Sequence, residues 1–528
     1  MVQAIRAVVA DLATNRFQFT RRAVHCAPWH IAAATTRTPC ARPAALLSMT
    51  DNPALLRRGN LAPLLLVNLG VAVHATIWYM ATTAMPSAVE ELDAAAYLSW
   101  ATSVYLVTSI LGGAMMAPAK GRLGALKAMV MAGFVVMAGG IVSAVAPSIF
   151  LVLAGRALQG LGEGVLVALS YALVRELFPN ALVPRVFGIQ AVSWAVAIVL
   201  GPLIGGWLTE IASWRAAFVC AALLPIPMQV LGWVILRRQP YAVRAQEAPL
   251  LRLLLLAFGV MAIAAADRLP HPLFGFMSVL AGFALMALVL RIDRRSRTHL
   301  FPTAFPSLRH PASLGLWVLL LMPLSEASVY VYGPYILQLH RGLSPTMAGY
   351  FGAIHAIAWT AFAIVVGPLH ARWQNAAILS GPLVLAFGLA GLAFTLSAQP
   401  LALVAACMVL VGIGFGISNA FLNQRVMAAA QPGQEDATAG AIPTLGGVGG
   451  AVSAALAGLV GNSIGMDRSL TTEIVSRASL ALFGGGAMVA LLATWLAWRL
   501  LGALAGRPKS ATDKSASPTV PDVQPSPH

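Results

Sequence analysis

Charged residues are scarce in this 528-residue sequence. Asp, Glu, Lys and Arg together make up 10% of it, whereas hydrophobic residues make up 59%. A soluble domain carries about 25% charged residues, because they cover much of its water-facing surface. The composition therefore excludes an ordinary soluble globular protein.

Acidic residues are the scarcer of the two charges. The sequence contains 18 Asp and Glu against 34 Lys and Arg, which gives a formal net charge of +16. The basic residues lie in short segments between hydrophobic runs and form no separate basic domain. Nucleic-acid-binding domains gather their positive charge on one folded unit. The sequence therefore predicts no nucleic-acid partner.

The sequence is also poor in cysteine and in catalytic motifs. It has no C-x-x-C pair, and its four cysteines lie far apart, at Cys26, Cys40, Cys220 and Cys407. This spacing indicates neither a disulfide framework nor a metal site. The sequence contains no G-x-x-x-x-G-K-[ST] loop and no H-E-x-x-H pair. We therefore expect no cofactor, no use of ATP and no enzymatic reaction.

Hydrophobic runs of about 20 residues recur along most of the chain. A helix of about 20 residues crosses a hydrocarbon core of about 30 Å, because each residue adds about 1.5 Å. Membrane strands would instead give short alternating segments. We predict an all-α polytopic membrane protein with about fourteen transmembrane helices, at residues 61–86, 97–117, 127–146, 148–172, 186–208, 214–236, 250–266, 273–291, 314–338, 346–368, 375–397, 400–423, 439–461 and 479–501.

Positive charge gathers in alternate loops. Basic residues follow the second, fourth, sixth and eighth predicted spans, whereas the loop SAVEELD at residues 87–93 is acidic. Basic loops stay in the cytoplasm, and an even number of spans returns the chain to its starting side. We expect a multi-pass protein in the lipid bilayer of a bacterial-type inner (plasma) membrane, with both termini cytoplasmic. The loop residues are Lys120, Arg122, Lys127, Arg175, Arg185, Arg237, Arg238, Arg244, Arg291, Arg294, Arg295 and Arg297.

The runs divide the chain into five predicted segments. Residues 1–60 are basic, lack a signal-peptide core and contain a second candidate start at Met49, so Met1–Ser48 is expected to be a mispredicted extension or a disordered tail. Residues 61–238 and 312–504 are predicted six-helix halves, and residues 239–311 a linker with two extra helices. The Pro- and Ser-rich residues 505–528 are predicted to form a disordered cytoplasmic tail.

Two neighbouring spans carry sequence motifs. The fourth contains L-x-x-R-x-x-Q-G-x-G, and the fifth contains GIQAVSWAVAIVLGPLIGG. Small residues at helical spacing let two helices approach closely, and a proline bends a helix. The motif residues are Leu153, Arg156, Gln159, Gly160 and Gly162 in the fourth span and Gly188, Gly201, Pro202, Gly205 and Gly206 in the fifth.

These motifs resemble the fourth-helix motif of major facilitator superfamily transporters and the antiporter motif of the superfamily's drug exporters. Ala197 stands where that antiporter motif usually has a glycine. The family's loop motif G-x-x-x-D-R-x-G-R-[KR] is degraded in APAKGRLGALK, which keeps Arg122 and Gly124 but has Gly121 in the aspartate position. The segment GPLHARWQ, with Arg372, echoes this loop after the tenth span and indicates an internal duplication.

The resemblance covers nearly all of residues 61–501 and implies both a fold and an activity. The fold is the major facilitator fold, with two six-helix halves and two extra linking helices, as in the fourteen-helix drug:proton antiporters. The activity is secondary active transport: proton-coupled efflux of drugs or other hydrophobic or amphipathic small molecules by alternating access, performed by a monomer. The alternative is an exporter or importer of one specific metabolite.

Arg156 and Glu163 are ionisable residues inside the fourth span. A charge at mid-bilayer costs at least about 2.5–3.5 kcal/mol, so such residues face protein or a water-filled cavity. Seven residues are about two helical turns, which places both side chains on one face about 10 Å apart along the axis. The motif favours a cavity role for Arg156, in proton coupling or anion binding, over a packing role. Glu163 is either a proton carrier or a packing partner.

Glu326 lies near the middle of the ninth span, the first of the second half. A protonated carboxyl group is far cheaper to bury than an ionised one, which suits proton exchange. We therefore group Glu326 with Arg156, Glu163 and His74, the nearest ionisable residue in the first span, as candidates for proton coupling. Residues predicted to line a substrate cavity, or else to pack on neighbouring helices, are Tyr330, Tyr332, His355, Asn419 and Asn423.

Overall fold

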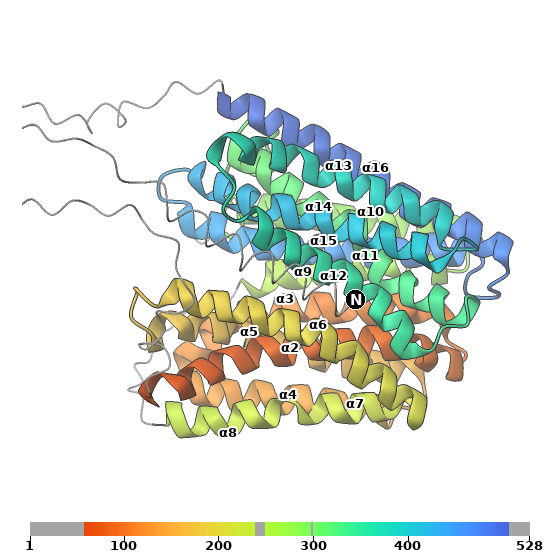
Figure 1. The fold of residues 1–528 in the computed structure, drawn as a ribbon, viewed down its shortest axis with the longest axis horizontal. Coiled ribbons are helices and arrows are strands. Elements are labelled where there is room, and N and C mark those ends of the chain that lie inside the picture. The colour runs from red at the N-terminus through yellow and green to blue at the C-terminus, as the bar shows by residue number, and fades with distance from the viewer. Residues whose placement is uncertain (1–57, 238–248, 297–298, 506–528) are drawn as a thin grey trace, which may run out of the picture. The chain divides into compact units, whose positions relative to one another are not determined.

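The computed structural model describes residues 58–237, 249–296 and 299–505, and within these ranges it is helical, without strands. This confirms the predicted all-α fold class. Most of the predicted basic N-terminal segment and C-terminal tail lies outside the described residues. The helices, shown in Figure 1, are α2 (Arg58–Glu91), α3 (Leu98–Leu123), α4 (Ala125–Ala144), α5 (Ile149–Leu177), α6 (Val183–Ile211), α7 (Trp214–Leu223), α8 (Pro225–Leu236), α9 (Leu250–Ala264), α10 (Pro272–Asp293), α11 (Pro311–Tyr335), α12 (Pro345–Val366), α13 (Ala371–Thr395), α14 (Leu401–Ala428), α15 (Glu435–Ile464) and α16 (Thr472–Ala505).

The helix bounds follow local sequence signals. Helix α12 begins at Pro345, where the fixed φ of proline suits a first turn and no amide hydrogen bond is lost. Ser344 caps this helix by accepting a hydrogen bond from the backbone N of Met347 at 3.4 Å. Helix α15 ends before Gly465, whose φ of +103° is a conformation that glycine adopts without strain.

Thirteen helical segments of the described chain are long and apolar enough to cross a membrane. The sixth predicted span is formed by α7 and α8 together, which are continuous apart from a break at Leu224. Helix α9 has 15 residues and extends only about 22 Å, so the predicted seventh span is shorter than a hydrocarbon core. The chain is a multi-pass membrane protein.

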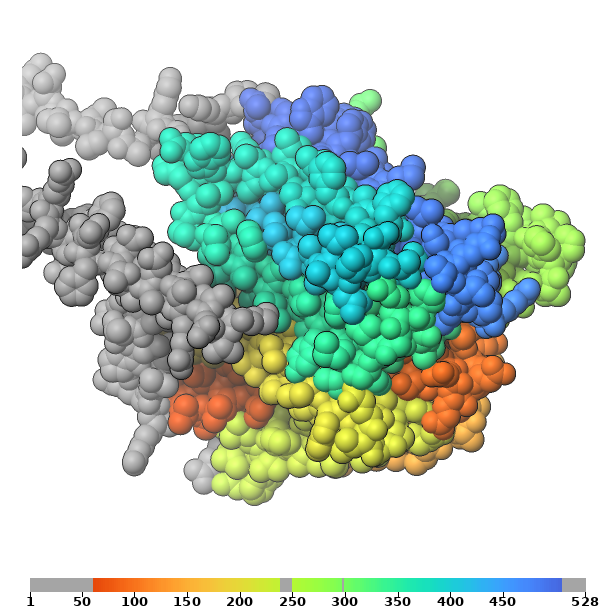
Figure 2. Space-filling view, turned by 45° about the vertical axis from the view of Figure 1, so that its right-hand side comes forward, coloured from red at the N-terminus to blue at the C-terminus, as the bar shows by residue number. Residues whose placement is uncertain are grey.

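Two groups of helices make up most of the described chain. In the first helix group, α2–α8, α5 packs against α3 and α4, and α2 packs against α6. In the second helix group, α11–α16, α13 packs against α14 and α16, and α11 packs against α15 and α16. The groups meet where α6 contacts α12 and α3 contacts α15; Figure 2 shows α6, in yellow, against the green surface around α12. Helices α9 and α10 form a hairpin, with α9 against both α3 and α15.

Glycines bring α3 and α5 into backbone contact. A Cβ on Gly160 would lie 2.4 Å from the carbonyl oxygen of Tyr105, and one on Gly164 would lie 2.1 Å from that of Ser109. Both distances are too short for any side chain, so glycine is required for this approach. The motif glycine Gly160 thereby places Tyr105 directly beside the motif face of α5.

The two groups are closed at one end, here called the outer end, which contains residues 92–97. There Asn462 donates to the carbonyl oxygen of Ala96 at 2.9 Å, and Glu210 accepts from the backbone N of Thr346 at 2.8 Å. A Cβ on Gly206 would lie 2.5 Å from Cα of Thr346. Helices α3 with α15 and α6 with α12 therefore touch closely at this end.

The opposite end, which contains Lys120, is here called the inner end. Gly188 near the start of α6 and Gly440 and Gly446 near the start of α15 have no atom within 4 Å of an added Cβ. Gly188 and Gly440 are also exposed. Toward this end Gly447 of α15 still meets Ile110 of α3, whereas the hydrogen bonds of Asn462 with Ala96 and of Glu210 with Thr346 lie at the outer end.

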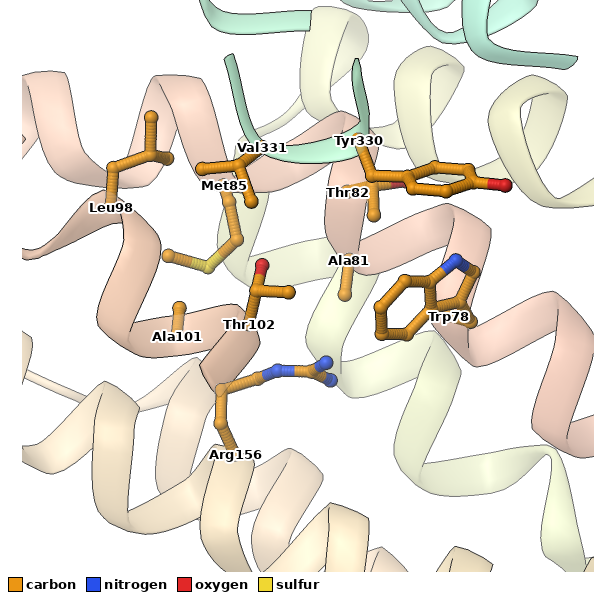
Figure 3. Close-up of a pocket in the computed structure, with 10 residues that line it drawn as sticks. All are labelled: Trp78, Ala81, Thr82, Met85, Leu98, Ala101, Thr102, Arg156, Tyr330 and Val331. Atoms are coloured by element: carbon orange, nitrogen blue, oxygen red, sulfur yellow. The ribbon is translucent and has the colours of Figure 1, made fainter. Parts of the chain in front are cut away.

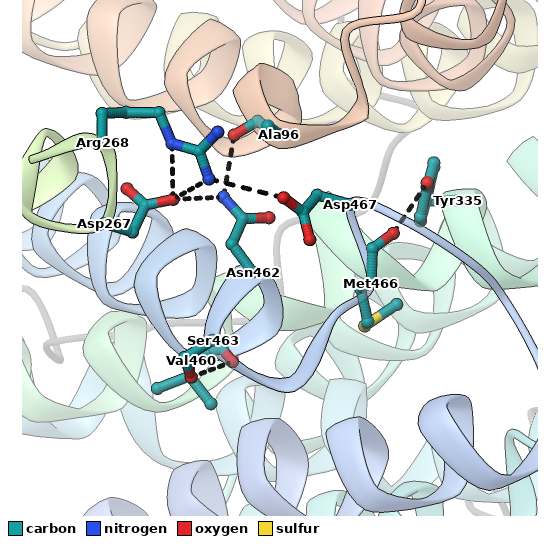
Figure 4. Close-up of polar contacts among 9 residues, drawn as sticks. All are labelled: Ala96, Asp267, Arg268, Tyr335, Val460, Asn462, Ser463, Met466 and Asp467. Carbon is teal, nitrogen blue, oxygen red and sulfur yellow. Dashed lines mark hydrogen bonds and ion pairs between the residues drawn. The ribbon is translucent and has the colours of Figure 1, made fainter. Parts of the chain in front are cut away.

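A polar cluster at the outer end joins three parts of the chain (Figure 4). Asp267, between α9 and α10, accepts from Arg268 at 2.6 and 2.9 Å and from Asn462 of α15 at 2.6 Å. Arg268 also lies 3.6 Å from Asp467 and stacks over Tyr97, at 5.7 Å from the ring centroid. Burial opposes the charge of Arg268, but the two aspartates outweigh it and raise its pKa. Arg268 therefore stays charged.

The segment after α10 is attached to the second helix group. The Asp293 carboxylate pairs with Arg252 of α9 and accepts from the backbone N of Phe301 at 3.0 Å. The backbone N of Thr303 donates to Gln434, just before α15, at 2.7 Å. The extra hairpin therefore contacts both groups at the outer end and the second group at the inner end.

Candidate functional site

A buried carboxyl–histidine pair lies in the first helix group. Tyr105 of α3 donates a hydrogen bond to Oε2 of Glu163 at 2.6 Å, and Nδ1 of His74 of α2 lies 3.1 Å from the same oxygen. The Glu163 side chain is completely buried, and its Oε1 has no hydrogen-bond partner among the described residues. Trp194 of α6 packs edge-on against His74, with centroids 5.7 Å apart. The first group therefore holds a carboxyl group where one proton can be shared among three side chains.

Arg156 lies beside this pair but is not bonded to Glu163. Its Nη1 donates to Gln159 at 2.8 Å, and its guanidinium lies over the Tyr105 ring, 4.1 Å from the centroid. The side chain is 3% exposed, and among the described residues no carboxylate forms an ion pair with it within 4 Å. Tyr105 thus touches Arg156 with its ring and Glu163 with its hydroxyl group.

A second carboxyl–histidine pair lies in the second helix group. Oε2 of Glu326 on α11 lies 3.2 Å from Nε2 of His355 on α12, and both side chains are buried. The Tyr330 hydroxyl oxygen lies 3.3 Å from Nδ1 of His355. Each helix group therefore contains a glutamate, a histidine and a tyrosine in contact.

Two small cavities lie between the helix groups. Trp78 of α2 and Tyr330 of α11 contact each other with ring centroids 6.1 Å apart, and together with Thr102 of α3 they line both cavities. Arg156 lines the smaller one, of about 10 Å³, as Figure 3 shows. Glu326 lines the larger one, of about 130 Å³. In the candidate site, Trp78 and Tyr330 thus lie between a cavity lined by the Arg156 guanidinium and a cavity lined by the Glu326 carboxyl group.

Neither cavity has room for a drug-sized molecule. The smaller holds about one water molecule. The larger, at about 130 Å³, is below the roughly 300–1,000 Å³ of small-molecule pockets. Binding of such a molecule therefore requires the two groups to move apart.

The structure separates some of the predicted cavity residues from this site. Tyr332 is buried and packs against Tyr335, with centroids 6.1 Å apart. Tyr332 faces Gly461 of α15 and points away from Tyr330, because residues two apart on a helix point in different directions. Asn423 donates to Asn419 on the same helix at 3.2 Å. None of Tyr332, Asn419 and Asn423 lines either cavity.

The motif residues of α6 pack against neighbouring helices. A Cβ on Gly201 would lie 2.5 Å from Tyr79 of α2, and one on Gly205 would lie 2.7 Å from Met80. Pro202 packs against α12, since a Cβ added to Gly349 would lie 2.8 Å from the Cβ of Pro202. The small residues of the motif thus let α6 contact one helix of each group.

The loop motif residues lie at the inner end. Gly124 separates α3 from α4 with a φ of +84°, which explains a glycine there. Arg122 is exposed, while nearby Lys120 forms an ion pair with Glu176 at the end of α5. Arg372 stacks over Trp373, 5.6 Å from the ring centroid. The basic residue that connects the end of α3 to α5 is therefore Lys120.

Sequence reasoning missed the residues that connect the candidates. Tyr105, Trp78, Thr102 and Trp194 are uncharged and lie in apolar runs, so the cost of burying charge does not single them out. The available signal was weak. It consisted of aromatic side chains with polar atoms in the middle of predicted spans, where such groups need hydrogen-bond partners.

Comparisons with known proteins give one family. The family model described as Major Facilitator Superfamily matches residues 67–454. A protein of Mycobacterium tuberculosis named "Probable multidrug-efflux transporter" is 32% identical over 410 residues, which cover 75% of this chain and 86% of that protein. The riboflavin transporter RibZ of Clostridioides difficile is 21% identical over 336 residues, which cover 63% of this chain and 73% of that protein.

Solved structures show the same fold. The crystal structure of peptide transporter POT in complex with alafosfalin has a TM-score of 0.61 at 18% identity, and the match covers 83% of this chain and 95% of that one. This likeness concerns the arrangement of the helices, because the sequences have diverged too far to carry a substrate from one to the other.

Proposed function

Because the chain belongs to the major facilitator superfamily and is therefore a membrane transporter, we propose that it exports drugs or other hydrophobic or amphipathic small molecules in exchange for protons. The observation that carries the proposal is the presence of a buried carboxyl–histidine pair in each helix group, one of them on the wall of an aromatic cavity. The relative named as a multidrug-efflux transporter supports the substrate class.

Proton exchange follows from the cost of burying charge. A protonated glutamate is cheap to bury, whereas an ionised one needs a cation, a hydrogen-bond donor or water. Glu163 has Tyr105 and His74 for this purpose, and Glu326 has His355. A substrate entering the cavity changes these surroundings and thereby favours proton uptake or release.

Alternating access supplies the movement. The proposed moving halves are residues 61–238 and 312–504, which contain the first and second helix groups, with residues 239–311 as the linker that carries the extra hairpin. In the described conformation contacts between the two groups close the outer end. Opening at alternate ends exposes the same midplane site to each side in turn.

The membrane potential and the pH gradient drive such a cycle without ATP. Moving one charge across 100 mV is worth about 2.3 kcal/mol, so one proton per cycle supports substantial accumulation of substrate outside.

The test is dye uptake into inverted membrane vesicles under an imposed pH gradient. We expect uptake that a protonophore abolishes and that needs no ATP. Glu326→Gln or Glu163→Gln mimics the protonated form and is expected to keep dye binding while losing proton-driven uptake. Glu473→Gln, on an exposed surface of α16, is the matched control. Uptake that requires ATP, or wild-type rates in the double Glu163/Glu326 variant, would contradict the proposal.

The second candidate is an exporter or importer of one specific metabolite. The relation to the riboflavin transporter favours it, since that protein is named for a single compound. Competition among chemically unrelated dyes separates the two: broad mutual inhibition supports the exporter of many compounds, and no inhibition supports the specific carrier.

A further inference from the structure

We propose that Arg156 binds an acidic group of the transported molecule, so that the substrates include aromatic compounds that carry a carboxylate. This inference rests on the proposed function as an exporter and adds a chemical class to it.

The one carboxylate that acts on Arg156 electrostatically, Glu163, does not form an ion pair with it. A guanidinium has five N–H donors, and a buried one is stable only when paired. The hydrogen bond to Gln159 and the stack on Tyr105 occupy one edge and one face. No ion pair to Arg156 within 4 Å occurs among the described residues. The remaining donors therefore suit an anionic partner that comes from outside the protein.

Glu163, the nearest carboxylate along α5, is already engaged. Its Oε2 accepts from Tyr105 at 2.6 Å and lies 3.1 Å from His74. The Tyr105 side chain stands between it and Arg156, with its ring against the guanidinium. This arrangement directs Glu163 toward α2 and leaves Arg156 to the cavity.

The residues around Arg156 match the chemistry of an aromatic acid, which would enter once the two helix groups move apart. Figure 3 shows the guanidinium directed between Thr102 and Trp78, with Tyr330 of the other helix group across the space. Arginine binds a carboxylate through two parallel hydrogen bonds, and the Trp and Tyr rings provide surface for an aromatic body. An aromatic cation without an acidic group would meet a like charge at this point.

The experiment uses two dyes that differ at one group. Rhodamine B has a free carboxylate, and rhodamine B ethyl ester does not. Binding of each dye to the purified protein is measured by fluorescence anisotropy, and uptake of each dye is measured in inverted vesicles under a pH gradient. The variants are Arg156→Gln, Arg156→Lys and the control Arg477→Gln, which removes an exposed arginine of α16.

We expect the wild-type protein to bind and transport rhodamine B better than its ester. Arg156→Gln should weaken binding of rhodamine B by about tenfold or more and leave binding of the ester unchanged or stronger, because the acid loses a charge-assisted pair and the ester loses a like charge. Arg156→Lys should fall between, since it keeps the charge and loses the fork of donors. If Arg156 had a purely structural role, Arg156→Gln would weaken the binding of both dyes equally and leave the ratio of their affinities unchanged.

The outcomes separate this inference from the proposed function. If the wild-type protein transports the ester as well as rhodamine B, or if Arg156→Gln affects both dyes equally, the carboxylate assignment is wrong and the exporter proposal stands. If neither dye binds or moves under the pH gradient, both proposals are contradicted.

Discussion

Tyr105 is the residue that connects the two ionisable groups of α5. Its hydroxyl group donates to Glu163 and its ring supports Arg156, so one side chain serves two functions. A substitution that removes only the hydroxyl group separates them.

Tyr105→Phe is expected to reduce proton-driven dye uptake by about tenfold, because a hydrogen bond to a charged group contributes about 1.5–3 kcal/mol. Exchange of labelled for unlabelled dye at equal pH on both sides should change by less than about twofold, since the ring stays under Arg156. Tyr335→Phe, which loses a buried hydrogen bond to Met466 away from the cavities, is the control. Equal loss of uptake and exchange would show that the hydroxyl group has no separate part in coupling.

The sequence identified the ionisable residues but not which of them pair with one another. Arg156, Glu163, Glu326 and His355 stand out because a charge or an imidazole in an apolar run is costly and rare. The contact between His74 and Glu163 joins positions 89 residues apart, and local spacing does not predict such a contact. Tyr330 lines the cavities and Tyr332 does not. The sequence could not distinguish the two tyrosines, because their helix is apolar on all sides and its pattern does not show which face points inward.

At the scale of helices, the close contact of α3 and α5 sets the geometry of the first carboxyl–histidine pair. Tyr105 and Glu163 are held at 2.6 Å because glycines of α5 let α3 approach its backbone.

Gly160→Ala is expected to lower the melting temperature of the purified protein, since the new methyl group would lie 2.4 Å from a backbone oxygen and the helices must separate. Overpacking of this kind costs about 1–3 kcal/mol. The control is Gly485→Ala on α16, where an added Cβ meets nothing within 4 Å and should leave the melting temperature unchanged or raise it. An unchanged melting temperature in Gly160→Ala would mean that α3 and α5 are less tightly packed than described.

Helix positions were more predictable than helix ends. Each predicted span corresponds to a helix or, for the sixth, to α7 and α8 together, because long apolar runs have one stable form in a bilayer; only the seventh, α9, is shorter than a hydrocarbon core. The ends differ because helices continue beyond the hydrocarbon core, and there capping rather than hydropathy determines where a helix begins and ends. Helix α16 begins at Thr472, ahead of the predicted residue 479, with Glu473 in its first turn.

At the scale of the whole molecule, the outer polar cluster should stabilise the closed outer end. Asn462→Ala removes the hydrogen bonds to Ala96 and Asp267. In a variant without native cysteines, Thr102→Cys places a thiol on the cavity wall. We expect an impermeant thiol reagent added outside to label it about fivefold faster when Asn462→Ala is also present, which corresponds to a shift of about 1 kcal/mol. Ser463→Ala is the control, because Ser463 is exposed and bonds only within its own helix. Unchanged labelling would mean that the cluster does not hold this end closed.

Membrane orientation is a second prediction at this scale. The basic loops place the inner end, with Lys120 and Arg122, in the cytoplasm and residues 87–93 outside. A fluorescent protein that matures only in the cytoplasm should be active when fused at the C-terminus, and a phosphatase that folds only outside should be active when inserted at residues 92–94. The reverse result would overturn the orientation and, with it, the direction of transport.

The attachment of the α9–α10 hairpin determines where the protein must divide when the outer end opens. At the inner end the segment after α10 is joined to the second helix group through Thr303 and Gln434, whereas at the outer end the hairpin contacts both groups. In the proposed cycle the hairpin moves together with the second group. The surface that opens and closes in every turnover then runs along the edge of the first group, between α9 and α3 and past Ala96 and Tyr97, and those contacts break and form again in each cycle.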